Sequence, residues 1–134
     1  MAGRELGRID EQLRRMVEGD AWHGPAVLEL LEGVTPEGAH ARPILGAHSI
    51  WEIVLHLASN YRVVLRRLGG EAATLAPEED WPAVSAPTVE GWRAAIDALR
   101  AVNAEMRRAV RGFDEERLDR PLVPASPYSA RSTP

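Results

Sequence analysis

The chain of 134 residues contains no cysteine and no lysine, and phenylalanine occurs only once. Without cysteine, the protein can form neither a disulfide framework nor a thiolate metal site. A chain of this kind suits a reducing compartment, and we expect it in the cytoplasm. The absences exclude cysteine nucleophiles and cysteine-rich metal modules from the functions to be considered.

Long apolar runs are also absent. No stretch approaches the roughly 18 apolar residues of a membrane-spanning helix. The N-terminal sequence "MAGRELGRIDEQLRR" lacks the apolar core of a signal peptide. The formal net charge of −4 argues against a general nucleic-acid-binding protein, which normally carries a basic face. We therefore expect a soluble protein that has neither membrane nor nucleic acid as a partner.

The hydrophobic periodicity is helical almost throughout the chain, and no run of alternating β-branched residues is present. It predicts long helices over about residues 4–18, 49–68 and 88–112. A further helical piece at 20–34 can form one kinked helix with the first. Only a short helix fits between residues 35 and 48, because Gly38 and Pro43 limit it.

Local signals indicate where these helices begin and end. Either His48 or Ser49 opens the second long helix, and Thr88 is suited to cap the third. Glycines follow both helices and are typical of helix ends. Residues 71–88 form a proline-rich loop that carries Trp81. Long loops in compact domains often cover a site, so Trp81 could border a pocket.

These helices predict an all-α bundle with up-and-down topology. Three long helices lie within residues 1–112. Residues 113–134 have several prolines and no apolar periodicity, so we expect an irregular tail there. The helix over 49–68 is apolar around more than half of its circumference. Another segment or a second chain must cover it, so we expect a fourth helix to be absent or supplied by a partner, and a homodimer to form.

His56 lies in a narrow polar stripe of that helix, together with Glu52 and Asn60. One interpretation is that the stripe is the solvent-facing side of an amphipathic helix. The other is that His56 binds a metal and Glu52, one turn away, contacts the imidazole. The spacing leaves both interpretations open.

Asn103 interrupts the apolar stripe of the third long helix, between Leu99 and Met106. A buried amide without partners costs roughly 1–3 kcal/mol. Asn103 is therefore either a polar core residue that fixes helix register or a group that faces a polar cavity shared with His56.

The remaining histidines, His23, His40 and His48, form no ligand pair at i and i+4, and we interpret them as structural or exposed. The sequence has no glycine-rich phosphate loop and no serine nucleophile motif. No catalytic residue is assigned.

One long stretch, residues 22–70, resembles the DinB/YfiT-like superfamily of helical-bundle proteins. The similar features are "HGP" before "LELLEGVTPEGA", then "RP", and above all "HSIWEIVLHL" at residues 48–57. The resemblance covers about residues 13–112. It implies a four-helix bundle that is often dimeric and binds a divalent metal such as Zn²⁺ or Ni²⁺ through three histidines. It also implies metal-dependent hydrolysis, or transfer reactions of low-molecular-weight thiols.

The resemblance places one metal ligand at His56 and the other two in an H-x3-H pair on the last helix. No histidine follows His56 in this sequence. Three explanations stay open: a truncated or frameshifted gene, a shortened sequence, or a lineage that has lost the metal. A site with three protein ligands and water cannot form from His56 alone. We expect a metal-dependent hydrolase or thiol transferase with an incomplete metal site. In it, Glu52, Asn60 and Asn103 would contact the liganding group or the substrate. The alternative is a non-enzymatic dimeric bundle or a small-ligand-binding remnant.

Overall fold

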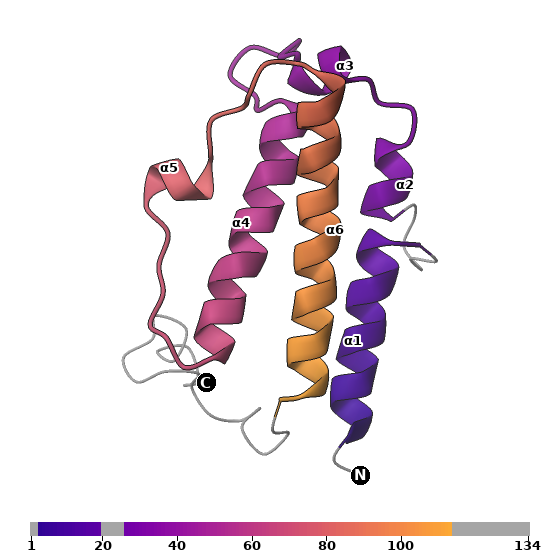
Figure 1. The fold of residues 1–134 in the computed structure, drawn as a ribbon, viewed down its shortest axis with the longest axis vertical. Coiled ribbons are helices and arrows are strands. Elements are labelled where there is room, and N and C mark those ends of the chain that lie inside the picture. The colour runs from indigo at the N-terminus through magenta and orange to yellow at the C-terminus, as the bar shows by residue number, and fades with distance from the viewer. Residues whose placement is uncertain (1–2, 20–25, 114–134) are drawn as a thin grey trace.

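The computed structural model describes residues 3–19 and 26–113, and over these ranges the chain is helical without any strand. Three long helices dominate: α1 (Gly3–Val17), α4 (Ile50–Leu68) and α6 (Val89–Arg111) (Figure 1). Three short helices connect them: α2 (Val27–Leu31), α3 (Pro36–His40) and α5 (Pro77–Asp80). The predicted all-α bundle is confirmed. No described helix is long and apolar enough to cross a membrane.

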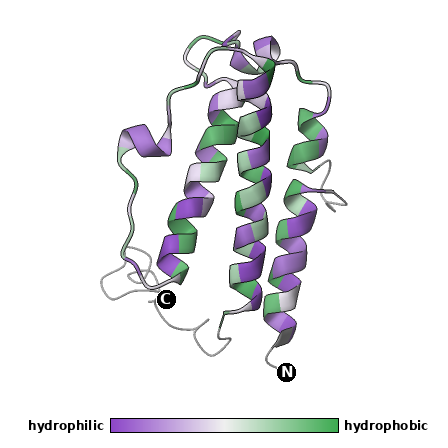
Figure 2. Cartoon of the chain, in the orientation of Figure 1, coloured by the Kyte–Doolittle hydropathy of each residue, from purple (hydrophilic) through white to green (hydrophobic). Residues whose placement is uncertain are grey.

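The three long helices lie side by side, with α6 between α1 and α4 (Figure 1). Each carries hydrophobic and hydrophilic positions in alternation along its length (Figure 2). On the α4 side of α6 the core contains Trp51 and Trp92, whose ring centroids are 5.3 Å apart. The Trp92 indole N–H donates to the Val34 carbonyl at 3.1 Å, which ties α6 to the segment between α2 and α3. Both tryptophans are buried in the core.

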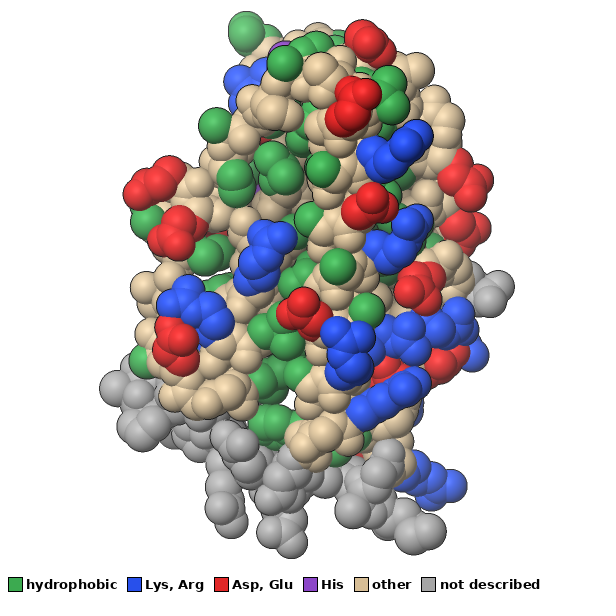
Figure 3. Space-filling view, in the orientation of Figure 1, with side chains coloured by type: hydrophobic (Ala, Val, Ile, Leu, Met, Phe, Trp, Pro, Cys, Tyr) green, Lys and Arg blue, Asp and Glu red, His purple; other side chains and the backbone are tan. Residues whose placement is uncertain are grey.

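A buried carboxylate fixes α1 to α6. The Asp10 side chain is only 4% exposed. Its two oxygens accept hydrogen bonds from Arg107 at 2.8 Å and from Arg111 at 2.7 Å. On the face seen in Figure 3, acidic and basic side chains are intermixed over these helices. The position of α1 therefore depends on a charge pair as well as on apolar packing.

The helix boundaries follow the local signals of the sequence. Ser49 caps α4: its hydroxyl accepts from the Glu52 N–H at 3.1 Å, and the Glu52 carboxylate accepts from the Ser49 N–H at 2.9 Å. Such a reciprocal pair is a capping box. It settles the choice between His48 and Ser49. Thr88 caps α6 by accepting from the Gly91 N–H at 3.0 Å, as predicted.

Among residues 26–34, the expected helix over residues 20–34 is shorter than predicted. There the helix α2 begins at Val27 and ends at Leu31, and Gly33 follows with a φ of 77°, in the left-handed region that favours glycine. Residues 20–25 and 114–134 lie outside the described residues. The predicted kink near Pro25 and the predicted irregular tail after residue 112 fall there and stay predictions.

Candidate functional site

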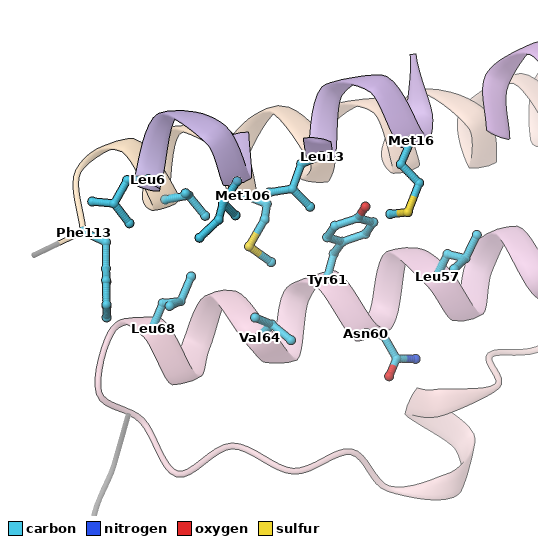
Figure 4. A pocket seen from close by; sticks show the side chains of 12 residues that line it. Leu6, Leu13, Met16, Leu57, Asn60, Tyr61, Val64, Leu68, Met106 and Phe113 are labelled. Carbon is cyan, nitrogen blue, oxygen red and sulfur yellow. The ribbon is translucent and has the colours of Figure 1, made fainter. Parts of the chain in front are cut away.

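An apolar groove of about 500 Å³ lies between α1 and α4, next to the C-terminal half of α6. Side chains of α1 and α4 face each other across it (Figure 4). Tyr61 and Asn60 are the lining residues with polar side-chain atoms, and every other lining side chain is apolar. The Asn60 amide is turned away from α1, toward the loop after α4 (Figure 4). Those apolar residues are Leu6, Ile9, Leu13, Met16, Leu57, Val64, Leu68, Met106, Val110 and Phe113.

The groove accounts for the unusually wide apolar face of α4. One side of this helix, with Trp51, Val54 and Ala58, is buried in the core. Another side, with Leu57, Val64 and Leu68, lines the groove. Val64 keeps 37% of its surface exposed. The described helices thus bury one apolar side of α4 and leave the other partly open.

His56 lies beside this groove and is bound by the loop that follows α4. Its Nδ1 atom is 2.8 Å from the backbone carbonyl oxygen of Asp80 and 3.0 Å from the Asp80 Oδ1 atom. Asn60, which lines the groove, donates from Nδ2 to the His56 carbonyl at 2.8 Å and to Asp80 Oδ1 at 3.1 Å. His56, Asn60 and Asp80 therefore form one hydrogen-bonded cluster at the edge of the groove.

Trp81 stacks between two histidines. Its ring lies 3.8 Å from that of His56, with an interplanar angle of 6°. On the other side the ring of His48 is 3.6 Å away at 7°. The loop after α4 therefore covers one face of the His56 imidazole. The expectation that His48 is exposed or structural agrees with this place in the stack.

The structure brings Asn60 to His56 but does not bring Glu52 there. Glu52 accepts two hydrogen bonds from Arg42, at 2.7 and 2.9 Å, and it lies 3.3 Å from His48. It also forms the capping box with Ser49. The helical wheel placed Glu52 near His56, but the Arg42 guanidinium and the open N-terminus of α4 attract its carboxylate instead.

These contacts make Glu52 a source of acid sensitivity. The Arg42 hydrogen bonds, followed by the backbone bond from Ser49, lower the pKa of Glu52 from 4.5 to about 2. A lowered folded-state pKa contributes stability above the unfolded-state value, and this stability is lost as the pH falls toward 2. We expect Glu52→Gln to show a smaller fall of unfolding free energy between pH 4.5 and 2 than the wild type in urea titrations. Equal falls in both proteins would contradict this role.

Asn103 lies in the core and not beside His56. The residue is 0% exposed, and its Nδ2 atom donates to the Tyr61 hydroxyl at 3.3 Å and to the Leu13 carbonyl at 3.4 Å. Its Oδ1 atom has no hydrogen-bond partner among the described residues. Burial raises the pKa of Tyr61, which keeps the phenol neutral. Asn103 thus joins α6 to α1 and α4, in agreement with a polar core residue that fixes register.

A family model described as the DinB superfamily matches residues 21–134. That range is most of the chain. This protein belongs to the DinB superfamily. No curated protein and no solved structure gives a significant match.

The DinB match confirms the resemblance based on "HSIWEIVLHL". The metal site that the resemblance implies can be tested against the side chains. Within residues 3–19 and 26–113, no group of three or more His, Cys, Asp or Glu side chains could hold a metal ion. The described part of this DinB chain does not fit a metal centre by itself. We therefore derive no chemical step from a metal.

Sequence reasoning missed Asp80 as a partner of His56. The two residues are 24 positions apart, and Asp80 belongs to the four-residue helix α5, which was not predicted. The presence of Trp81 on a long loop was the one available signal, and it does point to the correct segment.

Proposed function

We propose that this DinB superfamily protein binds a small, mostly apolar molecule in the groove between α1, α4 and α6. The observation that carries the proposal is the groove itself. Its volume of about 500 Å³ falls within the roughly 300–1,000 Å³ of small-molecule sites. An apolar lining with a few polar groups is also typical of such sites.

The cluster at the groove edge indicates the polarity of the ligand. Asn60 belongs both to the lining and to the hydrogen-bonded cluster of His56. A molecule with an apolar body in the groove would place a single polar end near these two residues. A medium-chain alcohol such as decanol has this chemistry, and we use it as the test ligand.

The experiment is a calorimetric titration of the unmodified chain with decanol at two or more temperatures. We expect saturable binding of one molecule per chain with a negative heat-capacity change, because apolar surface is buried. Absence of saturable binding would contradict the proposal. A second copy of the chain is the competing occupant of the groove. A stable homodimer in sedimentation equilibrium, together with no decanol binding, would favour that alternative.

The second candidate function is metal-dependent hydrolysis or transfer of a low-molecular-weight thiol, with His56 as a metal ligand. The observation in its favour is the bond from His56 Nδ1 to a backbone carbonyl, because metal-bound histidines commonly make such a bond with the second ring nitrogen. Other ligands would have to come from outside the described residues or from a second copy of the chain.

Metal content tests this candidate. The protein, purified without an affinity tag or chelator, is measured by elemental mass spectrometry before and after incubation with Zn²⁺ and Ni²⁺. A metal enzyme predicts near-stoichiometric metal that is lost in His56→Ala and kept in His40→Ala, the matched control at a histidine on α3. Metal-free protein in every sample would contradict the metal function and leave the groove proposal standing.

A further inference from the structure

The loop after α4 covers one face of the His56 ring and also contacts its Nδ1 atom. We propose that Asp80 and Trp81 are positioning residues that hold His56 in the tautomer with hydrogen on Nδ1. Nε2 is then left as the one nitrogen that can accept a hydrogen bond from a ligand. Only the identity of that ligand rests on the proposed function.

Nδ1 of His56 has three close neighbours, and they decide the tautomer. One is the Asn60 Nδ2 atom at 3.3 Å, but this amide makes shorter bonds to the His56 carbonyl and to Asp80 Oδ1. The other two neighbours belong to Asp80. The Asp80 carbonyl oxygen, 2.8 Å away, can only accept a hydrogen bond, and the nearby Oδ1 atom of the carboxylate at 3.0 Å is also an acceptor. A neutral imidazole has a single N–H, and its position is set by such a partner. The hydrogen must therefore be on Nδ1, and Nε2 keeps its lone pair.

The orientation of the ring is fixed by the same loop. Rotation of the imidazole by half a turn would replace Nδ1 with a carbon and break both contacts to Asp80. Stacking against Trp81 at 3.8 Å holds the plane of the ring. The Asp80 carbonyl is held in turn by α5, since the Asp80 N–H donates to the Ala76 carbonyl at 2.9 Å and the Trp81 N–H donates to the Pro77 carbonyl at 3.0 Å.

Asn60 has no hydrogen available to donate to the Nε2 atom of His56. Asn60 Nδ2 lies 3.4 Å from Nε2, but this amide has two hydrogens only. Shorter bonds use both of them, at 2.8 Å to the His56 carbonyl and at 3.1 Å to Asp80 Oδ1. The His56 side chain is 27% exposed, so solvent or a ligand can reach it. The fitting ligand is apolar with a terminal hydrogen-bond donor, such as a hydroxyl.

The test is a two-bond ¹H–¹⁵N correlation spectrum of the histidine rings, recorded without ligand and well above the ordinary histidine pKa of about 6.5. His56→Gln assigns the signals. We expect a protonated Nδ1 and an unprotonated Nε2 for His56. In Trp81→Ala the pattern should move toward the averaged tautomers of a free imidazole, whereas Trp81→Phe should keep the wild-type pattern.

Asp80→Ala is the second variant, since it removes one acceptor and leaves the loop backbone in place. It should raise the Nε2–H fraction, and Asp97→Ala, at an exposed aspartate of α6, should not. Circular dichroism checks that each variant is folded. A wild-type His56 in the Nε2–H or averaged form would overturn the proposal. So would wild-type patterns in both Trp81→Ala and Asp80→Ala.

Ligand binding gives a separate result. On addition of decanol, the Nε2 resonance should shift toward that of a hydrogen-bonded nitrogen, and the methyl ether of decanol, which has no donor, should bind without this shift. An equal Nε2 shift with both molecules would overturn the assigned ligand class. If neither molecule binds, the groove proposal fails, while the tautomer of the free protein is still decided by the spectra above.

Discussion

Replacing Val64 by glutamate is expected to weaken decanol binding by about tenfold or more, equivalent to about 1.4 kcal/mol. Val64 lines the groove from α4 and is 37% exposed. A glutamate there places a carboxylate against the apolar lining, where an uncompensated charge is costly. Because the side chain can turn toward solvent, the bundle should still fold. Calorimetric titration measures the change in affinity.

Val89→Glu is the matched control for this substitution. Val89 is 54% exposed, opens α6 and lies outside the groove. A glutamate in the first turn of a helix is favoured by the helix dipole. We expect wild-type affinity for decanol in Val89→Glu. Equal affinities in Val64→Glu and the wild type would show that decanol binds elsewhere.

Replacing Asp10 by alanine is expected to lower the free energy of unfolding by about 2–3 kcal/mol. Removal of Asp10 takes one partner out of a buried ion pair. The cost is below the roughly 3–5 kcal/mol of a fully buried pair, because both arginines reach solvent and Arg107 keeps Glu18 at 3.4 Å. The exposed side-chain fractions are 19% for Arg107 and 62% for Arg111. Urea denaturation measures the loss. Glu11→Ala, at a half-buried residue of α1 whose ion pairs with Arg14 and Arg15 lie at the surface, should cost no more than about 1 kcal/mol.

The Asp10 carboxylate also makes the free energy of unfolding depend on pH. Burial alone would raise the pKa of Asp10, but the hydrogen bonds and charges of Arg107 and Arg111 outweigh burial and lower the pKa below 3.8. The stability that Asp10 contributes is therefore present above the unfolded-state pKa and is lost as the pH falls through the folded-state value. Asp10→Ala should lack this acid-dependent part. Since α1 is one wall of the groove, the variant should also bind decanol less tightly; full stability and affinity would contradict the role of Asp10.

The sequence was sufficient for features that depend on neighbouring residues. Ser49 and Thr88 each precede a segment with helical apolar periodicity, so the starts of α4 and α6 could be predicted from their caps. The wide apolar face of α4 was also visible. One side of it packs in the core, while the expected cover of the other side, which lines the groove, stays a prediction. In both cases the signal lies within one or two helical turns.

The candidate site depends on contacts that local patterns do not encode. The His56–Asp80 bond is set by the path of the loop after α4, including the short helix α5. Likewise, the stripe around Asn103 predicted burial but could not identify Tyr61 as its partner, because that contact joins residues 42 positions apart. The helical spacing places Glu52 one turn from His56. Its carboxylate nevertheless binds Arg42 and the Ser49 N–H, and spacing along one helix does not predict these contacts.

The most direct test of ligand binding in the groove is an NMR titration of the wild-type chain, labelled with ¹³C at the methionine methyl groups, with decanol. Met16 on α1 and Met106 on α6 both line the groove, and they are 42% and 5% exposed. The account predicts that both methyl signals shift and saturate with the affinity found by calorimetry. Calorimetric binding without a shift of either methyl would contradict it, because the ligand would then occupy another part of the molecule.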